Sequence, residues 1–163
     1  MGIICFHNPD EPNGYLSNWW YSNFIVNGIT FNSSEQYMMY CKAITFGDME
    51  TAQQILKTRS FSKMKALGRA VQGYDDSVWS SVRYNVVKQG VLQKFIQNPE
   101  LAHQLISTGD NVLAECAVKD RIWAIGLSMT DPKRFDIGSW RGQNLLGKIL
   151  MEVREELRSM GFR

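Results

Sequence analysis

The sequence has few of the residues from which metal sites and disulfide frameworks are built. Its 163 residues include three cysteines and two histidines, and no two cysteines form a Cys-x-x-Cys pair. An odd number of widely spaced cysteines argues against a disulfide framework and against a cysteine-based zinc site. We therefore expect no metal and no cofactor, and we interpret Cys5, Cys41 and Cys116 as small buried apolar side chains.

The sequence also lacks a long apolar run and a large excess of charge of one sign. No stretch approaches the roughly 20 apolar residues that cross a bilayer, and the first residues lack the charged start of a secretory signal. Lysine and arginine total 18 against 16 acidic residues, and the basic residues are scattered along the chain. We therefore expect no membrane partner, a cytoplasmic location, and no sequence-independent binding of nucleic acid.

What is present suffices for one folded domain. Hydrophobic residues make up 44% of the chain and aromatic residues 12%, without an internal repeat, a low-complexity tract or a linker. A chain of this length and composition fits a single compact domain over residues 1–163. The oligomeric state is left open.

The β-forming segments are short and lie far apart in the chain. Residues 3–6 predict a strand, and residues 24–31 predict a hairpin because Asn27-Gly28 accepts the positive φ angles of a type I′ turn between two apolar segments. A further strand is expected within residues 110–116. These few strands come from distant parts of the chain.

Capping residues and apolar periodicity predict more helix than strand. Ser33 and Gln36 form a capping-box pattern that starts a helix through about Ala43, with Glu35 in its first turn. Further helices are expected over 48–57, 62–70, 75–98, 99–106 and from 145 onward. The predicted fold class is therefore α+β, mainly helical, with a small mixed or antiparallel sheet.

A polar, glycine-containing loop at residues 140–144 precedes the last helix. Unpaired amides at a helix N-terminus favour an anion, and Arg141 and Asn144 stand where they would add a charge and a hydrogen bond. Ordinary cap chemistry is the alternative interpretation of the same glycines. Within the helix, the apolar stripe predicts that Glu152, Arg154, Glu155 and Arg158 face outward.

Two carboxylates, a lysine and an indole form a candidate catalytic set. Glu35 and Lys42 are seven residues apart, so they share one helix face at about 10 Å along the axis. Each residue also has an ordinary interpretation: a solvated surface pair for these two, a loop salt bridge for Asp120, and core packing for Trp79. If they meet in space, they suit cleavage of a glycosidic bond to a heteroaromatic amine.

Six spaced segments, in order, resemble the YbiA/NADAR family. They are Gly14-Tyr-Leu-Ser-Asn18; Ser34-Glu35-Gln36-Tyr37 followed by Lys42; Gly68-Arg69; Trp79-Ser-Ser-Val-Arg83; Asp120-Arg-Ile-Trp-Ala-Ile-Gly126; and Gly142-Gln-Asn-Leu-Leu-Gly147 with Leu150-Met-Glu-Val-Arg154. The resemblance extends from Phe6 almost to the C-terminus. Any one segment is weak evidence, whereas all six in order are specific.

The resemblance implies an N-glycosidase. Some members of the family split the base from the ribose phosphate in early riboflavin-pathway intermediates, and others remove ADP-ribose from modified guanine. It places Glu35, Trp79 and Asp120 at functional positions, and Lys42 where a nucleophile would form a Schiff base with an opened ribose. The substrate-binding residues expected from it and from the phosphate argument are Asn18, Arg69, Trp123, Gly126, Arg141 and Asn144.

The substrate that we expect is a small phosphorylated N-riboside. Nucleic acid enters only through the alternative that the enzyme removes ADP-ribose from guanine, and a noncatalytic module that binds ADP-ribose or a nucleotide is a further alternative. Two departures from the family pattern bear on the substrate: Gln36 stands where the family has histidine, and Ala124 where it has glycine. The first removes an imidazole and the second narrows the approach of the backbone to a ligand.

Overall fold

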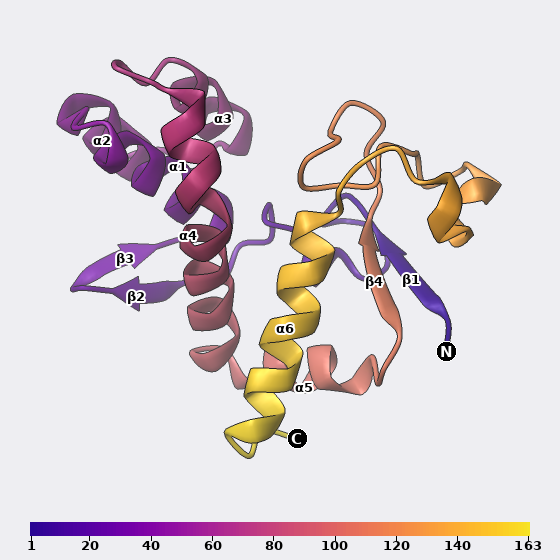
Figure 1. Cartoon of the computed structure of the whole chain (residues 1–163). Coiled ribbons are helices and arrows are strands. Elements are labelled where there is room, and N and C mark those ends of the chain that lie inside the picture. Colours follow the sequence, from indigo (N-terminus) through magenta and orange to yellow (C-terminus); the bar gives the residue numbers. More distant parts are fainter. The chain divides into compact units, whose positions relative to one another are not determined.

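The computed structural model describes residues 1–163, which form two compact units. The first unit comprises residues 1–20 and 99–163, and the second comprises residues 21–98. Figure 1 labels the elements of both. The six α-helices outnumber the four strands, so the predicted α+β class is confirmed. None of these helices combines the length and the apolar character that a bilayer crossing requires.

The first unit is built on a parallel pair of strands covered by the last helix. Its elements are β1 (Ile3–Phe6), η1 (Gly14–Leu16), α5 (Pro99–Ser107), β4 (Val112–Glu115), η2 (Pro132–Phe135), η3 (Ile137–Ser139) and α6 (Leu145–Ser159). β1 pairs with β4 in parallel, with Cys5 opposite Ala114. In Figure 1, α6 runs beside β4, with β1 at the far side of β4.

The second unit is a helical group with one hairpin. Its elements are β2 (Phe24–Val26), β3 (Ile29–Phe31), α1 (Ser34–Thr45), α2 (Met49–Leu56), α3 (Phe61–Arg69) and α4 (Asp76–Ile96). The hairpin is antiparallel, and Asn27 and Gly28 adopt the positive φ angles, 50° and 79°, that the sequence predicts. The four strands thus form two separate two-stranded sheets, one parallel and one antiparallel, rather than one small sheet.

The predicted caps are present, although one differs in detail. Ser33 Oγ accepts a hydrogen bond from the Gln36 amide, as the capping box requires. The Gln36 side chain, however, accepts from the Asn32 amide, one residue before the cap, and its Nε2 donates to the Ile55 carbonyl. Gln36 therefore ties the start of α1 to the end of α2.

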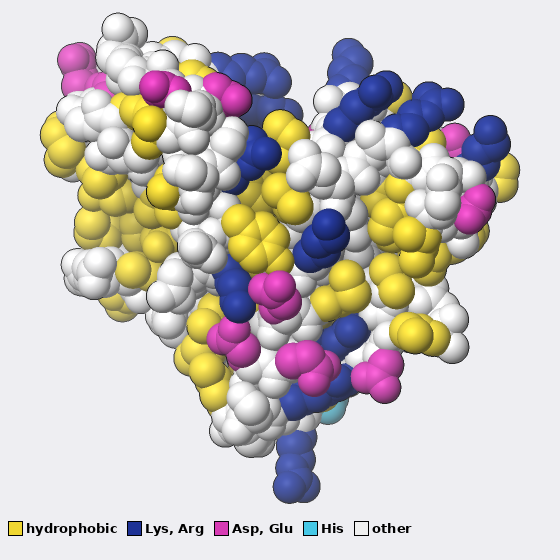
Figure 2. Space-filling view, in the orientation of Figure 1, with side chains coloured by type: hydrophobic (Ala, Val, Ile, Leu, Met, Phe, Trp, Pro, Cys, Tyr) yellow, Lys and Arg dark blue, Asp and Glu magenta, His cyan; other side chains and the backbone are white.

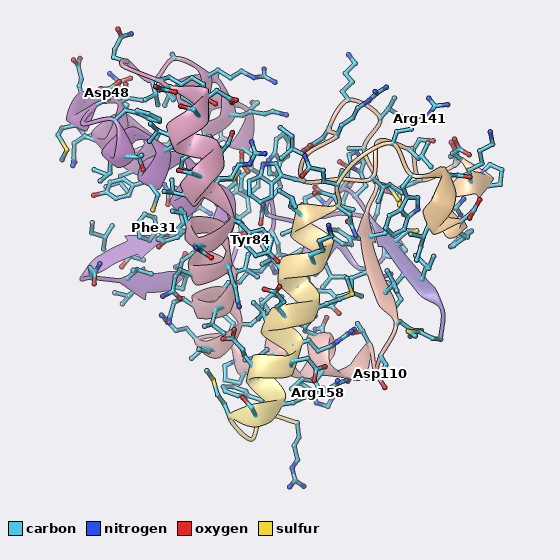
Figure 3. The ribbon with its side chains drawn as sticks, viewed as in Figure 1. Phe31, Asp48, Tyr84, Asp110, Arg141 and Arg158 are labelled. Carbon is cyan, nitrogen blue, oxygen red and sulfur yellow. The ribbon has the colours of Figure 1, made fainter.

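One outward-facing residue of the predicted last helix lies inside. Arg154 is buried, and its Nη1 donates to Thr108 Oγ1 at 2.8 Å and to the Asn111 carbonyl at 2.9 Å. The prediction that Arg154 faces outward is wrong because the apolar stripe is not the only buried surface of the helix: the turn after α5 offers oxygen acceptors to the guanidinium. By contrast, Arg158 is paired with Asp110 near the C-terminal end of α6 (Figure 3), and acidic and basic side chains are intermixed where α6 runs in Figure 2.

α1 packs tightly against two neighbouring helices at glycines. A Cβ at Gly68 of α3 would lie 2.0 Å from Met39 Sδ, and a Cβ at Gly90 of α4 would lie 2.2 Å from Tyr37 Cδ1. The Tyr37 ring also contacts Phe31 of the hairpin edge-on, with centroids 5.0 Å apart. These contacts fix the rotation of α1 about its axis, and so they determine which way Glu35 and Lys42 face.

Gly90→Ala is expected to destabilise the protein by about 1–3 kcal/mol because the added methyl overlaps a ring that cannot move freely. Helix propensity alone would predict a gain of about 1 kcal/mol, so the sign of the change distinguishes the two effects. Urea unfolding measures it. Gln89→Ala, at the exposed neighbouring position, is the control and should change stability by less than about 0.5 kcal/mol. Equal stability of the two variants would contradict tight packing at Gly90.

Candidate active site

The lysine predicted as a nucleophile lies in a cluster of charged groups in the second unit. Lys42 is in the last turn of α1, and its Nζ lies 4.6 Å from the centroid of the Tyr74 ring. Burial lowers the pKa of Lys42, and the positive charge of Arg69 lowers it further, whereas the charges of Asp76 and Glu35 act in the opposite direction. The amine is therefore easier to deprotonate than an ordinary lysine.

Helices α1 and α3 bring three members of this cluster together. Glu35 is buried in the first turn of α1, where the positive end of the helix dipole favours an ionised carboxylate. Arg69 ends α3 and is exposed, and the close approach at Gly68 holds that end of α3 against α1. The structure thus places the predicted residues Glu35, Lys42 and Arg69 in one neighbourhood.

Two members of the cluster were not found by sequence reasoning. Tyr74 donates its hydroxyl to Asp76 Oδ1 at 2.8 Å, and its ring contacts Phe46 edge-on. Asp76 is the first residue of α4, where Asp75 provides the cap by accepting from the Ser77 amide. The signal was the doubled aspartate: because one carboxylate caps the helix, the other is available for a different role.

Trp79, the predicted site residue on α4, is buried. Its side chain is 6% exposed, three residues after Asp76 and so on the same side of the helix. Arg83 follows one turn later and acts electrostatically on Tyr74. Burial of this kind suits an indole that packs in the core as well as one that forms the wall of a ligand site.

The first unit contains the other predicted residues, most of them in the segment between β4 and α6. Asp120 Oδ1 accepts hydrogen bonds from the amides of Ile122 and Trp123, at 3.0 and 2.9 Å. This carboxylate therefore fixes the turn that carries the half-buried indole of Trp123. Asn18 lies elsewhere, buried in the turn that follows η1.

Gly126 and Gly142 allow two parts of this segment to lie against each other. The Ile125 carbonyl accepts from the amides of both Arg141 and Gly142 at 2.8 Å, and Gly126 has a φ of 74°. A Cβ at Gly142 would lie 2.2 Å from the Ala124 carbonyl oxygen. Glycine at both positions is thus explained by backbone packing, while the exposed Arg141 side chain extends away from the chain (Figure 3).

The start of α6 is not open to an anion as the sequence suggested. The amides of Asn144, Leu145 and Leu146 donate to the carbonyls of Ala124, Ile122 and Trp123. The expectation that these amides face a phosphate is wrong, because the preceding loop folds back over the helix end and its carbonyl oxygens accept their hydrogen bonds.

Asn144 itself joins the last helix to β4. It is buried in a left-handed conformation, its Nδ2 donates to the Leu113 carbonyl at 2.9 Å, and its Oδ1 accepts from the Glu115 amide at 3.1 Å. Both ends of the amide are therefore bonded to one strand, which supports a structural role for this residue.

Asn144→Ala is expected to lower the free energy of unfolding by about 2–4 kcal/mol, because it leaves two buried backbone groups without partners. Denaturant unfolding gives the change. Gln143→Ala, at the exposed preceding position, should lie within about 0.5 kcal/mol of the parent. An unchanged stability with weakened substrate binding would instead favour the predicted ligand contact.

A cavity of about 410 Å³ lies beside the hairpin of the second unit. It contains none of the predicted site residues and no charged side chain, so it does not suit a phosphorylated ligand. Its lining residues are Ile25, Val26, Asn27, Tyr37, Gln89 and Gln93.

The comparisons with known proteins agree with one another. The family model described as the NADAR domain matches residues 5–158. An N-glycosidase of Acanthamoeba polyphaga mimivirus is 39% identical over 161 residues, covering 94% of this chain and 95% of that protein. A riboflavin biosynthesis protein of Vibrio vulnificus is 36% identical over 154 residues, covering 94% of this chain and 38% of that protein. The NMR structure of the E. coli protein YbiA matches with a TM-score of 0.80 and 29% identity, covering 98% of this chain and 87% of that one.

Proposed function

The chain belongs to the NADAR domain family, and we propose that it is an N-glycosidase that releases ribose 5-phosphate from a phosphorylated ribosylamino-pyrimidine. The mimivirus relative is named an N-glycosidase and the Vibrio relative a riboflavin biosynthesis protein, which supports this reaction and this substrate class. The observation that carries the proposal is the half-buried Lys42 amine beside Arg69, with Glu35 on the same helix.

The proposed reaction begins with an opened ribose joined to the heterocycle through a C=N bond. The neutral Lys42 amine adds to the sugar carbon, the bond from that carbon to the heterocycle breaks, and the departing amine receives a proton. Water then adds to the new C=N bond between the sugar carbon and Lys42. The bond from that carbon to the lysine nitrogen breaks, which releases free ribose 5-phosphate and restores the Lys42 amine. The sum is one water consumed and one amine released, with no net change at Lys42.

The other predicted side chains have roles that follow from their charge, their aromatic rings or their backbone contacts. Glu35 donates and recovers the protons that accompany C–N cleavage. The family pattern assigns the role of a second carboxylate to Asp120. In the second unit, Arg69 provides a guanidinium group for the phosphate, and Trp79 provides aromatic surface for the heterocycle. The sequence assigns the same kinds of contact to Arg141 and Trp123 in the first unit. Gly126 and Asn144 support these groups through the backbone, whereas Asn18 is assigned to the substrate by the family pattern.

A second substrate is favoured by one surface feature. Lys57, Arg59, Lys63, Lys65 and Arg69 are all exposed, and no acidic residue occurs between positions 51 and 74. The interpretation that basic residues are scattered is thus wrong for this segment. An exposed basic run suits a phosphate backbone, as in guanine-linked ADP-ribose within nucleic acid.

The two substrates are separated by assaying both with the purified protein. A ribosylaminopyrimidine phosphate should yield ribose 5-phosphate, and an oligonucleotide carrying ADP-ribosylated guanine should yield less product per unit time. A Lys63→Ser/Lys65→Ser variant is the matched control, because it should affect only the oligonucleotide reaction and reduce its salt dependence. Faster release of ADP-ribose would reverse the assignment, and binding of either compound without release would refute catalysis.

The pH dependence of kcat is expected to shift in opposite directions when the two charges beside Lys42 are removed. Because the neutral amine is the reactive form, kcat should rise with pH through the pKa of Lys42. Arg69 lowers that pKa and Asp76 raises it, so Arg69→Gln should move the midpoint to higher pH and Asp76→Asn to lower pH. Rates at saturating substrate measure both. A shift in the same direction for the two variants would contradict a role for neutral Lys42.

A further inference from the structure

Two cysteines that are far apart in the sequence lie together in the first unit. β1 and β4 pair in parallel with Cys5 opposite Ala114, so Cys116, two residues beyond Ala114, points to the same face of the sheet. The Cys116 amide donates to the Phe6 carbonyl at 2.8 Å, which holds the two strand ends together. Ala114, which lies opposite Cys5, carries only a methyl group, and Cys5 packs against the apolar cluster that contains Cys116.

The two thiols differ in accessibility. Cys116 is 1% exposed and belongs to an apolar cluster with Ile125 and Leu127, while Cys5 packs against this cluster and is half-buried. A small oxidant therefore reaches Cys5 first. Cys116, protected from solvent, is placed to react with an oxidised Cys5 rather than with the oxidant.

A guanidinium group faces the pair. Arg134, in η2, lowers the pKa of Cys5 through its charge and a hydrogen bond, after the larger effect of the Cys116 thiol and against desolvation. Its Nε is buried without a partner, although its Nη1 donates to the Asp131 carbonyl at 2.9 Å. A cation beside a half-buried thiol stabilises the thiolate, which is the reactive form.

We propose that Cys5 and Cys116 form a site of reversible oxidation by hydrogen peroxide. The Cys5 thiolate attacks one peroxide oxygen, the O–O bond breaks, and hydroxide leaves with the thiol proton as water. Cys5 is then a sulfenic acid. The Cys116 sulfur attacks the Cys5 sulfur, the S–O bond breaks, and the departing hydroxide takes the Cys116 proton and leaves as a second water. Two thiols lose two electrons in total and one peroxide accepts them.

The disulfide would lie next to the segment that carries Asp120 and Trp123. Cys116 is the first residue after β4, and the Ile125 amide donates to the Glu115 carbonyl at 2.9 Å. Oxidation would therefore link β1 covalently to the start of this segment. A dithiol provides the reversible form, because reduction restores both free cysteines.

The test is peptide mapping of the full chain after treatment with stoichiometric peroxide. We expect a peptide pair joined through Cys5 and Cys116, lighter by two hydrogen atoms and separated again by dithiothreitol. Cys41 is the internal control: burial raises its pKa to about 11, so it should remain a thiol. Oxidation of Cys41 at an equal rate, disulfides only between molecules, or Cys5 oxidised to sulfinic acid while Cys116 stays reduced would each overturn the proposal.

A variant separates the effect of the Arg134 guanidinium on the reactivity of Cys5 from the effect of having the two cysteines close together. Arg134→Gln should slow oxidation of Cys5 by about threefold or more, and should move alkylation of Cys5 by iodoacetamide to higher pH. Lys133→Gln, at the exposed neighbouring position, should change neither rate. Equal rates in the parent and both variants would refute the assigned role of Arg134, and this outcome is independent of any glycosidase activity.

Discussion

Glu35→Gln is expected to lower kcat by about 10²- to 10⁴-fold, with a smaller change in KM, because glutamine keeps the size of the side chain but does not transfer a proton. Glu35 is 5% exposed in the first turn of α1, so solvent does not readily replace it as the proton donor. Release of ribose 5-phosphate from a ribosylaminopyrimidine phosphate measures the effect.

The control is a first-turn glutamate on a different helix. Glu50 lies in the first turn of α2 but is exposed, so Glu50→Gln should retain the parent rate. Thermal unfolding of both variants separates lost catalysis from lost folding. Equal release by the parent and by a folded Glu35→Gln protein would remove this carboxylate from the mechanism.

The local elements follow from the sequence because their determinants are close together. Asn27-Gly28 specifies a turn by its own backbone preference, and Ser33 and Asp48 cap α1 and α2 by accepting from amides three residues on. Each of these interactions joins residues that are only a few positions apart in the sequence. Nothing distant is needed to predict them.

The interactions that were missed connect residues far apart in the chain. Asn144 binds the backbone of β4 about thirty positions earlier, and Arg154 finds acceptors near the end of α5. In sequence, an asparagine before a helix and an arginine on its polar side have ordinary local roles. Only the tertiary contacts decide that both are buried and bonded.

In the candidate site too, the sequence predicts the relations between nearby residues but not those between distant ones. The spacing of Glu35 and Lys42 was enough to place them on one face of α1, since helix geometry fixes that relation. Tyr74 and Asp76 were not predicted, because their nearness to Lys42 depends on where α4 begins relative to α1. The sequence therefore indicates the reactive groups but not the neighbours that tune the amine.

Lys42→Met is expected to abolish the covalent adduct and to lower kcat by about 10³-fold or more, since methionine fills the space beside Tyr74 without a nucleophilic nitrogen. Borohydride added during turnover should reduce the C=N bond in the parent and leave a ribose phosphate on the peptide that contains Lys42, which mass spectrometry detects. Lys57→Met, at an exposed position after α2, should form the adduct normally. If Lys42→Met stays active and forms no adduct, hydrolysis proceeds by direct attack of water, and the carboxylates alone must supply the catalysis. An adduct that maps to another lysine would instead assign the nucleophile to that residue.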